Sequence, residues 1–333
     1  MNRRKGFLEF DSELFTAFYV AAILWILNGG FNKGGYRLLD CTSTPVPKNA
    51  YESFNKTLYG KFGALMSLET TARKEYLKEH VPEAIHMDLA VGTYPRLYQA
   101  YTMYPPELFQ KYMRRLGINT SDVLILYGRG DLHGMLYSCF TAYLLKAFGH
   151  EKVSVLDGGF SQWRKHGGEV TKEVPNLPEG NWKASLENSR IISYDELTKC
   201  DKAGNDLFDR IGSVNWLDAR PRGQFLGEQP TGLDPQSVPG SCIPGSKSTP
   251  VEELFVGGVL KPVDEIRKWL IECGYERGKP TIISCGRGLH ASVLAYIVDY
   301  IDPSMKPRVY VGSLEELENK NPMKISGGKI CAR

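Results

Sequence analysis

The residues best suited to chemistry lie in one loop of the chain, within the segment TIISCGRGLHASVLAY at 281–296. Cys285 follows a short apolar strand there and precedes an apolar helix. A glycine-rich turn at such a junction directs several backbone N–H groups inward, and the helix adds the positive end of its dipole. Because these groups stabilise an anion, we expect the pKa of the Cys285 thiol to fall and the nucleophilic thiolate to be available near neutral pH.

The neighbours of Cys285 support this interpretation. Arg287 adds a positive charge two residues along, and Gly286 and Gly288 suit a tight loop that needs unusual φ values and close backbone approach. A lone cysteine after a strand is more often a small buried hydrophobe. The glycines, the arginine and the helix start favour a functional Cys285 instead.

Length and composition restrict the class of protein. The chain has 333 residues, enough for two ordinary domains, and its 42% hydrophobic and 24% charged content is typical of a globular protein. A net charge of +3 is too small to indicate a nucleic-acid partner. Seven cysteines without C-x-x-C spacing indicate free thiols in a reducing compartment and give no zinc site.

The amino end contains an apolar stretch at 14–27, preceded by three basic residues at 3–5. It is shorter than the roughly 20 residues that a membrane span needs, so no membrane association is predicted. A secretory signal peptide is the alternative, but acidic residues interrupt the approach and no small-residue cleavage site follows. We expect a buried helix that ends at Gly29 and Gly30.

Strands and helices alternate along the rest of the chain, which predicts an α/β fold with helices covering the sheets. The fully apolar run at 122–127 is typical of a central strand in a covered parallel sheet. The predicted strands of the first half are 36–42, 122–127 and 152–156, with a polar, proline-rich crossing loop after the first. The predicted helices are 105–116, 135–148 and a short one through Trp163.

The second half repeats this order after a linker at 173–188, which is rich in proline, glycine and asparagine. Segments 213–220, 263–273, 281–285 and 308–317 correspond to 37–42, 105–116, 123–127 and 153–163. A period of about half the chain indicates one duplicated domain. We therefore predict domains at 1–172 and 189–333, and we assign the chemistry to the second, because the loop 128–134 has no nucleophile at its strand end.

Six short motifs, in the right order and on the right elements, resemble those of the tandem rhodanese-type sulfurtransferases, thiosulfate sulfurtransferase and 3-mercaptopyruvate sulfurtransferase. They are HVPEA at 80–84, FGH at 148–150 with VLDGGF at 155–160, DAR at 218–220, GEQP at 227–230, CIPGS at 242–246 and CGRGLHAS at 285–292. The resemblance covers about residues 22–323. It implies two tandem rhodanese-like domains, each a mostly parallel sheet covered by helices on both faces, with the first domain non-catalytic.

The resemblance also implies a two-step transfer of sulfane sulfur. The Cys285 thiolate would attack the outer sulfur of an anionic donor, thiosulfate or 3-mercaptopyruvate, and the resulting persulfide would pass that sulfur to cyanide or a thiol. Loop amides suit both steps because thiolate, persulfide and leaving group are all negative. No metal or organic cofactor is expected, the protein is predicted to be a monomer, and its predicted location is cytoplasmic, with the mitochondrion as the alternative.

Departures from the family pattern concern the donor site. Gln224 stands where an arginine usually follows the glycine after D-x-R, with Arg222 as the candidate substitute. Leu233, which cannot bind a carboxylate, stands at about the position of a second donor-binding arginine of the mercaptopyruvate branch. His290 replaces the usual threonine of the loop, where it either tunes the thiolate or caps the helix. Arg287 favours the thiosulfate branch.

The predicted site has Cys285 as the catalytic residue. The predicted substrate-binding residues are Gly286, Arg287, Gly288, His290 and Arg222, and His80 and His133 are expected as wall residues of the cleft.

Three functions from different classes stay open. The first is a thiosulfate-type sulfurtransferase, and the second is a rhodanese-like binding or regulatory module with weak or no turnover. The third is a phosphatase, which needs C-x5-R so that an arginine clamps phosphate. The residue at that spacing is Ala291, which argues against it.

Overall fold

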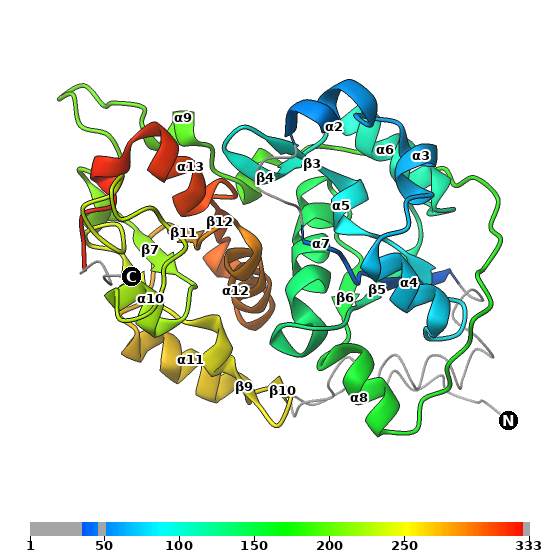
Figure 1. The fold of residues 1–333 in the computed structure, drawn as a ribbon. Coiled ribbons are helices and arrows are strands. Elements are labelled where there is room, and N and C mark those ends of the chain that lie inside the picture. The colour runs from blue at the N-terminus through cyan, green and yellow to red at the C-terminus, as the bar shows by residue number, and fades with distance from the viewer. Residues whose placement is uncertain (1–34, 46–50, 329–333) are drawn as a thin grey trace, which may run out of the picture.

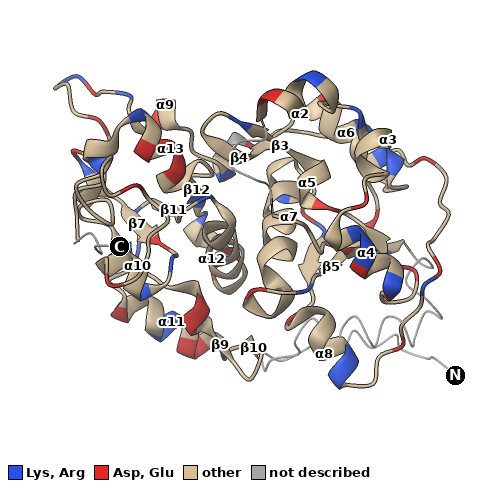
Figure 2. Ribbon diagram, viewed as in Figure 1, with Lys and Arg blue, Asp and Glu red and all other residues tan. Residues whose placement is uncertain are grey.

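In the computed structural model of this protein, the described residues are 35–45 and 51–328 (Figure 1). The helix predicted at 14–27 lies outside them. No helix in these two ranges is long and apolar enough to cross a membrane. Acidic and basic residues both occur on helices of the two halves (Figure 2).

The first half contains a four-stranded parallel sheet with the strand order β2-β1-β5-β6. Its strands are β1 (Tyr36–Asp40), β2 (Ile85–His86), β5 (Val123–Tyr127) and β6 (Val153–Val155). As predicted, the apolar run at 122–127 forms an inner strand, β5, because both of its faces are buried. Leu124 and Leu126 belong to one hydrophobic cluster, and Ile125 and Tyr127 belong to another on the opposite face.

The predicted helices of the first half are present as α6 (Pro106–Arg115), α7 (Met135–Ala147) and α8 (Gly159–Lys165). The prediction of a crossing loop without helices or strands after the first strand is wrong. That segment contains α2 (Tyr51–Thr57), α3 (Phe62–Met66), α4 (Thr71–Lys78), α5 (Leu89–Gly92) and the antiparallel pair β3 (Thr93–Arg96) and β4 (Gln99–Met103). Local caps start two of these helices, since Thr70 accepts the Arg73 N–H and Asp88 accepts the Ala90 N–H.

The second half repeats the strand order as β8-β7-β11-β12, again with every pair parallel. Its strands are β7 (Asn215–Asp218), β8 (Lys247–Ser248), β11 (Thr281–Ser284) and β12 (Arg308–Val309), and a separate hairpin joins β9 (Phe255–Val256) to β10 (Val259–Leu260). Its helices are α9 (Tyr194–Leu197), α10 (Arg222–Leu226), α11 (Val263–Glu272), α12 (Leu289–Ile301) and α13 (Ser313–Lys320). Short 3-10 turns are η1 (Leu132–Gly134), η2 (Asn188–Arg190), η3 (Ile211–Ser213), η4 (Val251–Leu254), η5 (Pro303–Met305) and η6 (Pro322–Lys324). The matching order agrees with a duplicated domain.

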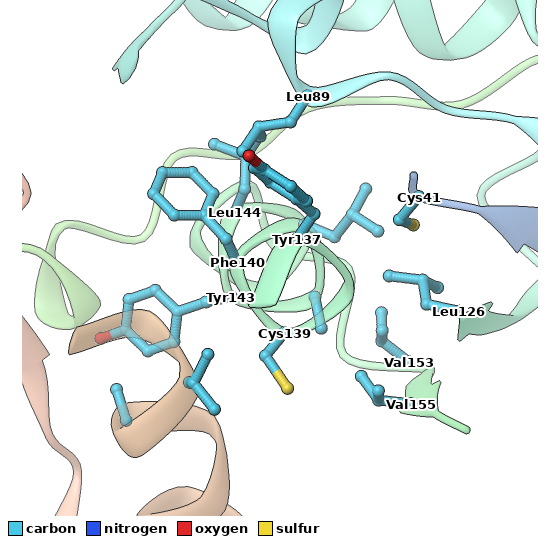
Figure 3. Packing of buried hydrophobic residues seen from close by; sticks show 14 of the residues in the cluster. Cys41, Leu89, Leu126, Tyr137, Cys139, Phe140, Tyr143, Leu144, Val153 and Val155 are labelled. Carbon is cyan, nitrogen blue, oxygen red and sulfur yellow. The ribbon is translucent and has the colours of Figure 1, made fainter. Parts of the chain in front are cut away.

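Helices α7 and α12 lie side by side at the centre of the molecule and join the two halves (Figure 1). Tyr143 on α7 donates to the Pro307 carbonyl at 2.8 Å, and Lys146 lies 2.7 Å from Asp299 near the end of α12. Side chains around α7 pack into a hydrophobic cluster that continues into the second half (Figure 3). Because the late residues of both helices meet, the helices run parallel, and the loops that precede them lie at the same end.

The predicted linker at 173–188 has no helix or strand as far as residue 187, and η2 begins at its last residue. The linker packs against the first half. Trp182 is fully buried there, and its indole N–H donates to His150 at 3.0 Å. The Trp182 carbonyl accepts from Arg114 at 2.8 Å. The domain limits at 172 and 189 stay a prediction.

Candidate active site

The Cys285 loop joins β11 to α12 at the carboxyl edge of the second sheet. On the neighbouring strand β7, Asp218 pairs with Ser284, and the next residue, Ala219, donates its N–H to the Ser284 carbonyl at 2.9 Å. Because parallel strands bring their carboxyl ends together, the motifs at 218–220 and 285–288 form one site.

Backbone N–H groups of the loop point toward the cysteine sulfur, as predicted. The Gly288 N–H donates to the Cys285 Sγ at 3.1 Å, and the backbone N–H groups of Arg287 and Ala291 also favour the thiolate. These donors come from the turn and the first residues of α12, where N–H groups have no partner within the helix.

The two glycines of the loop differ in what they require. Gly288 has φ +89°, and a Cβ at this position would lie 2.6 Å from the Val311 carbonyl oxygen, so only glycine fits. Gly286 does not have a positive φ, and the space at its Cβ is open. The expectation of an unusual φ is therefore confirmed for Gly288 and wrong for Gly286.

The pKa of the Cys285 thiol is raised above its ordinary value, so the prediction of a lowered pKa is wrong. The cause is burial, because only 1% of the residue is exposed, and the nearby Asp218 carboxylate adds to it. The loop amides oppose this shift without overcoming it. Sequence pattern indicated the donors correctly, but it carries no information on how deeply the sulfur is enclosed.

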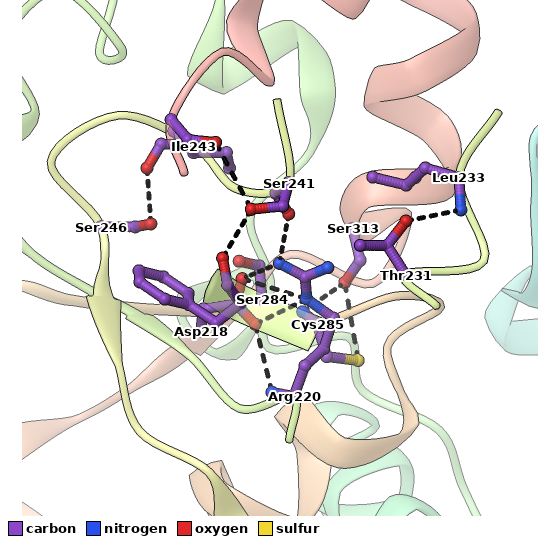
Figure 4. Close-up of polar contacts among 12 residues, drawn as sticks. Asp218, Arg220, Thr231, Leu233, Ser241, Ile243, Ser246, Ser284, Cys285 and Ser313 are labelled. Carbon is purple, nitrogen blue, oxygen red and sulfur yellow. Dashed lines mark hydrogen bonds and ion pairs between the residues drawn. The ribbon is translucent and has the colours of Figure 1, made fainter. Parts of the chain in front are cut away.

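The start of α13 holds the Cys285 loop in place. The Ser313 hydroxyl accepts the Cys285 N–H at 3.1 Å, donates to the Tyr310 carbonyl at 2.7 Å and lies 4.0 Å from the Cys285 Sγ (Figure 4). The Leu314 N–H donates to the Cys285 carbonyl at 3.1 Å. Ser313 has φ +50°, a conformation that non-glycine residues rarely adopt. Sequence reasoning missed this residue because 28 positions separate it from Cys285.

Both arginines predicted to bind the donor have carboxylate partners. Arg287 Nε lies 3.1 Å from each carboxylate oxygen of Glu315. Arg222, at the start of α10, contacts both oxygens of Glu253 at 3.0 Å and interacts with the Cys273 thiol. Within the described residues, no polar contact of Arg222 reaches the loop 285–288, so the structure does not join this residue to the rest of the predicted site.

His290 is half-buried in the first turn of α12. Burial lowers its pKa below the ordinary value, although the negative charges of Glu252 and Asp131 oppose the shift. Glu252 belongs to η4 and Asp131 to the loop 128–134, so the two halves both contribute acidic groups beside His290. The N-cap residue of α12 is Gly288, which has no side chain to cap the helix.

Asp218 and Arg220 form an ion pair that is almost fully buried, with 1% and 2% of each residue exposed (Figure 4). Arg220 Nε lies 3.0 and 3.1 Å from the two carboxylate oxygens, and Nη2 lies 2.7 Å from Oδ2. Nη2 also donates to the Ser241 carbonyl at 2.8 Å. The motif at 218–220 contributes to the family resemblance, but sequence pattern alone assigned Arg220 no role.

The corresponding loop of the first half has no space for a nucleophile. A Cβ at Gly128 would lie 2.8 Å from the Gly134 carbonyl oxygen. Arg129 follows, with its Nη1 2.7 Å from Asp40 and its guanidinium 3.9 Å from the centre of the Phe160 ring. These contacts explain physically why the first half carries no catalytic cysteine here.

The two predicted wall histidines have different surroundings. The His133 ring centre lies 5.5 Å from that of Phe255 in the second half, so this side chain lies between the halves. His80 is fully buried, with its ring nitrogens 2.7 Å from the Tyr76 carbonyl and 3.1 Å from the Glu173 carbonyl. His80 is therefore a core residue, and its assignment to the cleft wall is wrong.

No group of three or more His, Cys, Asp or Glu side chains that could hold a metal ion occurs among residues 35–45 and 51–328. The six cysteines in these ranges are all free thiols.

Sequence comparison gives matches over most of the chain. A sequence model of the rhodanese-like domain matches residues 56–166. The Caenorhabditis elegans protein named "Putative thiosulfate sulfurtransferase mpst-1" is 42% identical over 304 residues, which are 90% of this chain and 93% of that protein. The 3-mercaptopyruvate sulfurtransferase of Escherichia coli K12 is 30% identical over 248 residues, covering 73% of this chain and 82% of the relative.

Solved structures share the fold over nearly the whole chain. Escherichia coli SseA, described as a 3-mercaptopyruvate sulfotransferase, gives a TM-score of 0.66 at 24% identity, covering 89% of this chain and 96% of its own. Tum1 of Saccharomyces cerevisiae gives a TM-score of 0.68 at 21% identity, covering 93% and 97%. These likenesses and the sequence matches together establish that the chain belongs to the rhodanese-type sulfurtransferase family and has its fold of two tandem rhodanese-like domains.

Proposed function

We propose that this protein transfers sulfane sulfur from thiosulfate to cyanide or a thiol through a persulfide on Cys285. The observation that carries the proposal is the loop of amides around the Cys285 Sγ, with the Gly288 N–H at 3.1 Å. A thiolate and a persulfide in the same place are both stabilised by these donors.

The reaction balances in two steps. The Cys285 thiolate attacks the outer sulfur of thiosulfate, the S–S bond of the donor breaks, and sulfite leaves with the bonding electron pair. Cyanide then attacks the outer sulfur of the persulfide, thiocyanate leaves, and the Cys285 thiolate is regenerated. Because the pKa of the free thiol is raised, loss of its proton limits the first step, and the rate should increase with pH.

The choice of thiosulfate over 3-mercaptopyruvate rests on what surrounds the loop. In the resemblance, the mercaptopyruvate branch has a second donor-binding arginine at about the position of Leu233, and the basic residue Arg287 is typical of the thiosulfate branch. Leu233 is 7% exposed and packs in a hydrophobic cluster, so it offers no carboxylate a partner. Relatives named for both donors support the family without choosing between them.

Thiocyanate formation from thiosulfate and cyanide tests the proposal, with Cys285→Ser as the control. The wild-type protein should form thiocyanate and the variant should not. Equal rates for the two proteins would contradict the assignment of Cys285. 3-Mercaptopyruvate in place of thiosulfate, at equal concentration, tests the choice of donor.

A second candidate function is a rhodanese-like binding or regulatory module with weak turnover. The pairing of Arg287 with Glu315 and of Arg222 with Glu253 favours it, because both positive charges are compensated. This candidate predicts that Cys285 takes up one sulfur atom but that thiocyanate forms little faster than in the Cys285→Ser variant. We further propose a monomer in the cytoplasm, which gel filtration and cell fractionation test.

A further inference from the structure

The buried guanidinium of Arg220 has donors left over after its structural contacts are counted. An arginine carries five N–H donors. Nε and Nη2 use three of them on Asp218 and the Ser241 carbonyl. Nη1 is buried and has no hydrogen-bond partner among the described residues. A buried charged donor without a partner is costly, so it calls for a ligand or a functional reason.

Arg220 lies at the same edge of the second sheet as Cys285. It is the second residue after β7, whose last residue pairs with Ser284, the residue before Cys285. Burial acts to lower the pKa of Arg220, but the Asp218 charge and hydrogen bonds, together with the Cys285 and Cys242 thiols, raise it. The Cys285 sulfur is therefore within electrostatic reach of the guanidinium, and Figure 4 shows both side chains in one group of polar contacts.

We propose that Arg220 stabilises the negative charge on the Cys285 sulfur electrostatically and, through Nη1, donates a hydrogen bond to the outer sulfur of the Cys285 persulfide. The inference rests on the proposed function and adds a catalytic residue to it. Asp218 binds Nε and Nη2 of the guanidinium. Nη1 is therefore left to donate to the negatively charged sulfur.

The role explains how a buried thiol can react. Burial and the Asp218 carboxylate both disfavour the Cys285 thiolate. A positive donor at the sulfur offsets this after the proton has left, and no proton or electron passes through Arg220 itself. Arg287 is less suited to this role, because Glu315 binds its Nε.

The Arg220→Lys variant tests the proposal. A lysine keeps the positive charge that compensates Asp218, but its single ammonium group cannot bind Asp218 and also donate a hydrogen bond to the sulfur as the planar guanidinium can. A lost hydrogen bond from a charged donor corresponds to a roughly 10- to 100-fold lower rate. We expect this loss in the rate of persulfide formation from thiosulfate, followed by intact mass, together with a shift of the pH profile of iodoacetamide alkylation at Cys285 to higher pH.

The matched control is Arg129→Lys, which changes the Arg129–Asp40 pair of the first half and should leave both readouts unchanged. A folded Arg220→Lys protein with the wild-type rate and alkylation profile would overturn the inference, whereas failure of the wild type to gain sulfur would overturn the proposed function instead.

If Arg220→Lys does not fold, nitrogen-15 arginine spectra of the wild type give the answer. The Nη1 protons of Arg220 should shift downfield when the persulfide forms, and unchanged signals would refute the proposal.

Discussion

Asp157 gives this protein a pH dependence of folding stability that can be measured. It follows β6 in the first half, is 5% exposed, and accepts the Leu260 N–H of the second half with both oxygens, at 3.0 and 3.1 Å. Burial raises its pKa from the ordinary 3.8 to about 6. The replacement Asp157→Asn removes the charge but keeps a carbonyl oxygen for the Leu260 N–H.

The sign follows from proton binding. Between about pH 4 and pH 6 the folded protein keeps a proton on Asp157 that the unfolded chain releases, so stability falls as the pH rises through this window. The gap between the two pKa values corresponds to about 3 kcal/mol in total, of which about 1.4 kcal/mol develops between pH 5 and pH 7.5. The free energy of unfolding of Asp157→Asn, relative to wild type, should therefore increase by about that amount over the same range.

Urea unfolding followed by tryptophan fluorescence at pH 5, 6 and 7.5 measures this difference, because other titrating groups cancel between the two proteins. Glu169→Gln, which changes an exposed carboxylate, is the control and should show no such trend. A wild-type-to-Asp157→Asn difference that is constant with pH, or that shrinks as the pH rises, would refute the reasoning.

The remaining predictions concern the site and its supports. Gly288→Ala should destabilise the protein by about 1–3 kcal/mol and lower sulfur transfer, because its Cβ has no space, whereas Gly286→Ala should change stability little; equal unfolding midpoints would count against the loop geometry. Ser313→Ala should cost about 1–3 kcal/mol, since the buried Cys285 N–H loses its acceptor, and should slow thiocyanate formation; an unchanged rate would show that the hydroxyl does not position the loop. Arg222→Ala should leave the KM for thiosulfate within about twofold and stability within about 1 kcal/mol, because this exposed arginine pairs with a carboxylate; a large rise in KM would place it in the donor site after all.

Sequence pattern was sufficient for the parts of the fold that local chemistry specifies. The apolar run at 122–127 predicts an inner strand, which is present as β5. The glycine-rich junction after β11 predicts backbone N–H groups directed at Cys285, and the Gly288 N–H donates to its sulfur. Sequence pattern does not reveal the short helices α2 to α5, because segments of four to eight residues are too short for a hydrophobic period to show.

The wrong predictions at the site concern how deeply side chains are buried and which residues they pair with, because both depend on residues far away in the sequence. The thiol pKa is raised because other elements bury Cys285, and Arg287 is compensated by Glu315 on α13. Ser313 supports the loop from the start of α13, 28 positions along the chain from Cys285. His80 was misplaced because its backbone partners, at Tyr76 and Glu173, become apparent only when the chain folds.

The central claim is that the Cys285 sulfur accepts and releases one sulfur atom, and the intact mass of the protein after incubation with thiosulfate tests it most directly. We predict a gain of one sulfur atom in the wild type, lost on addition of cyanide, and no gain in Cys285→Ser. A wild-type mass that does not change, or a gain that persists in Cys285→Ser, would contradict the account.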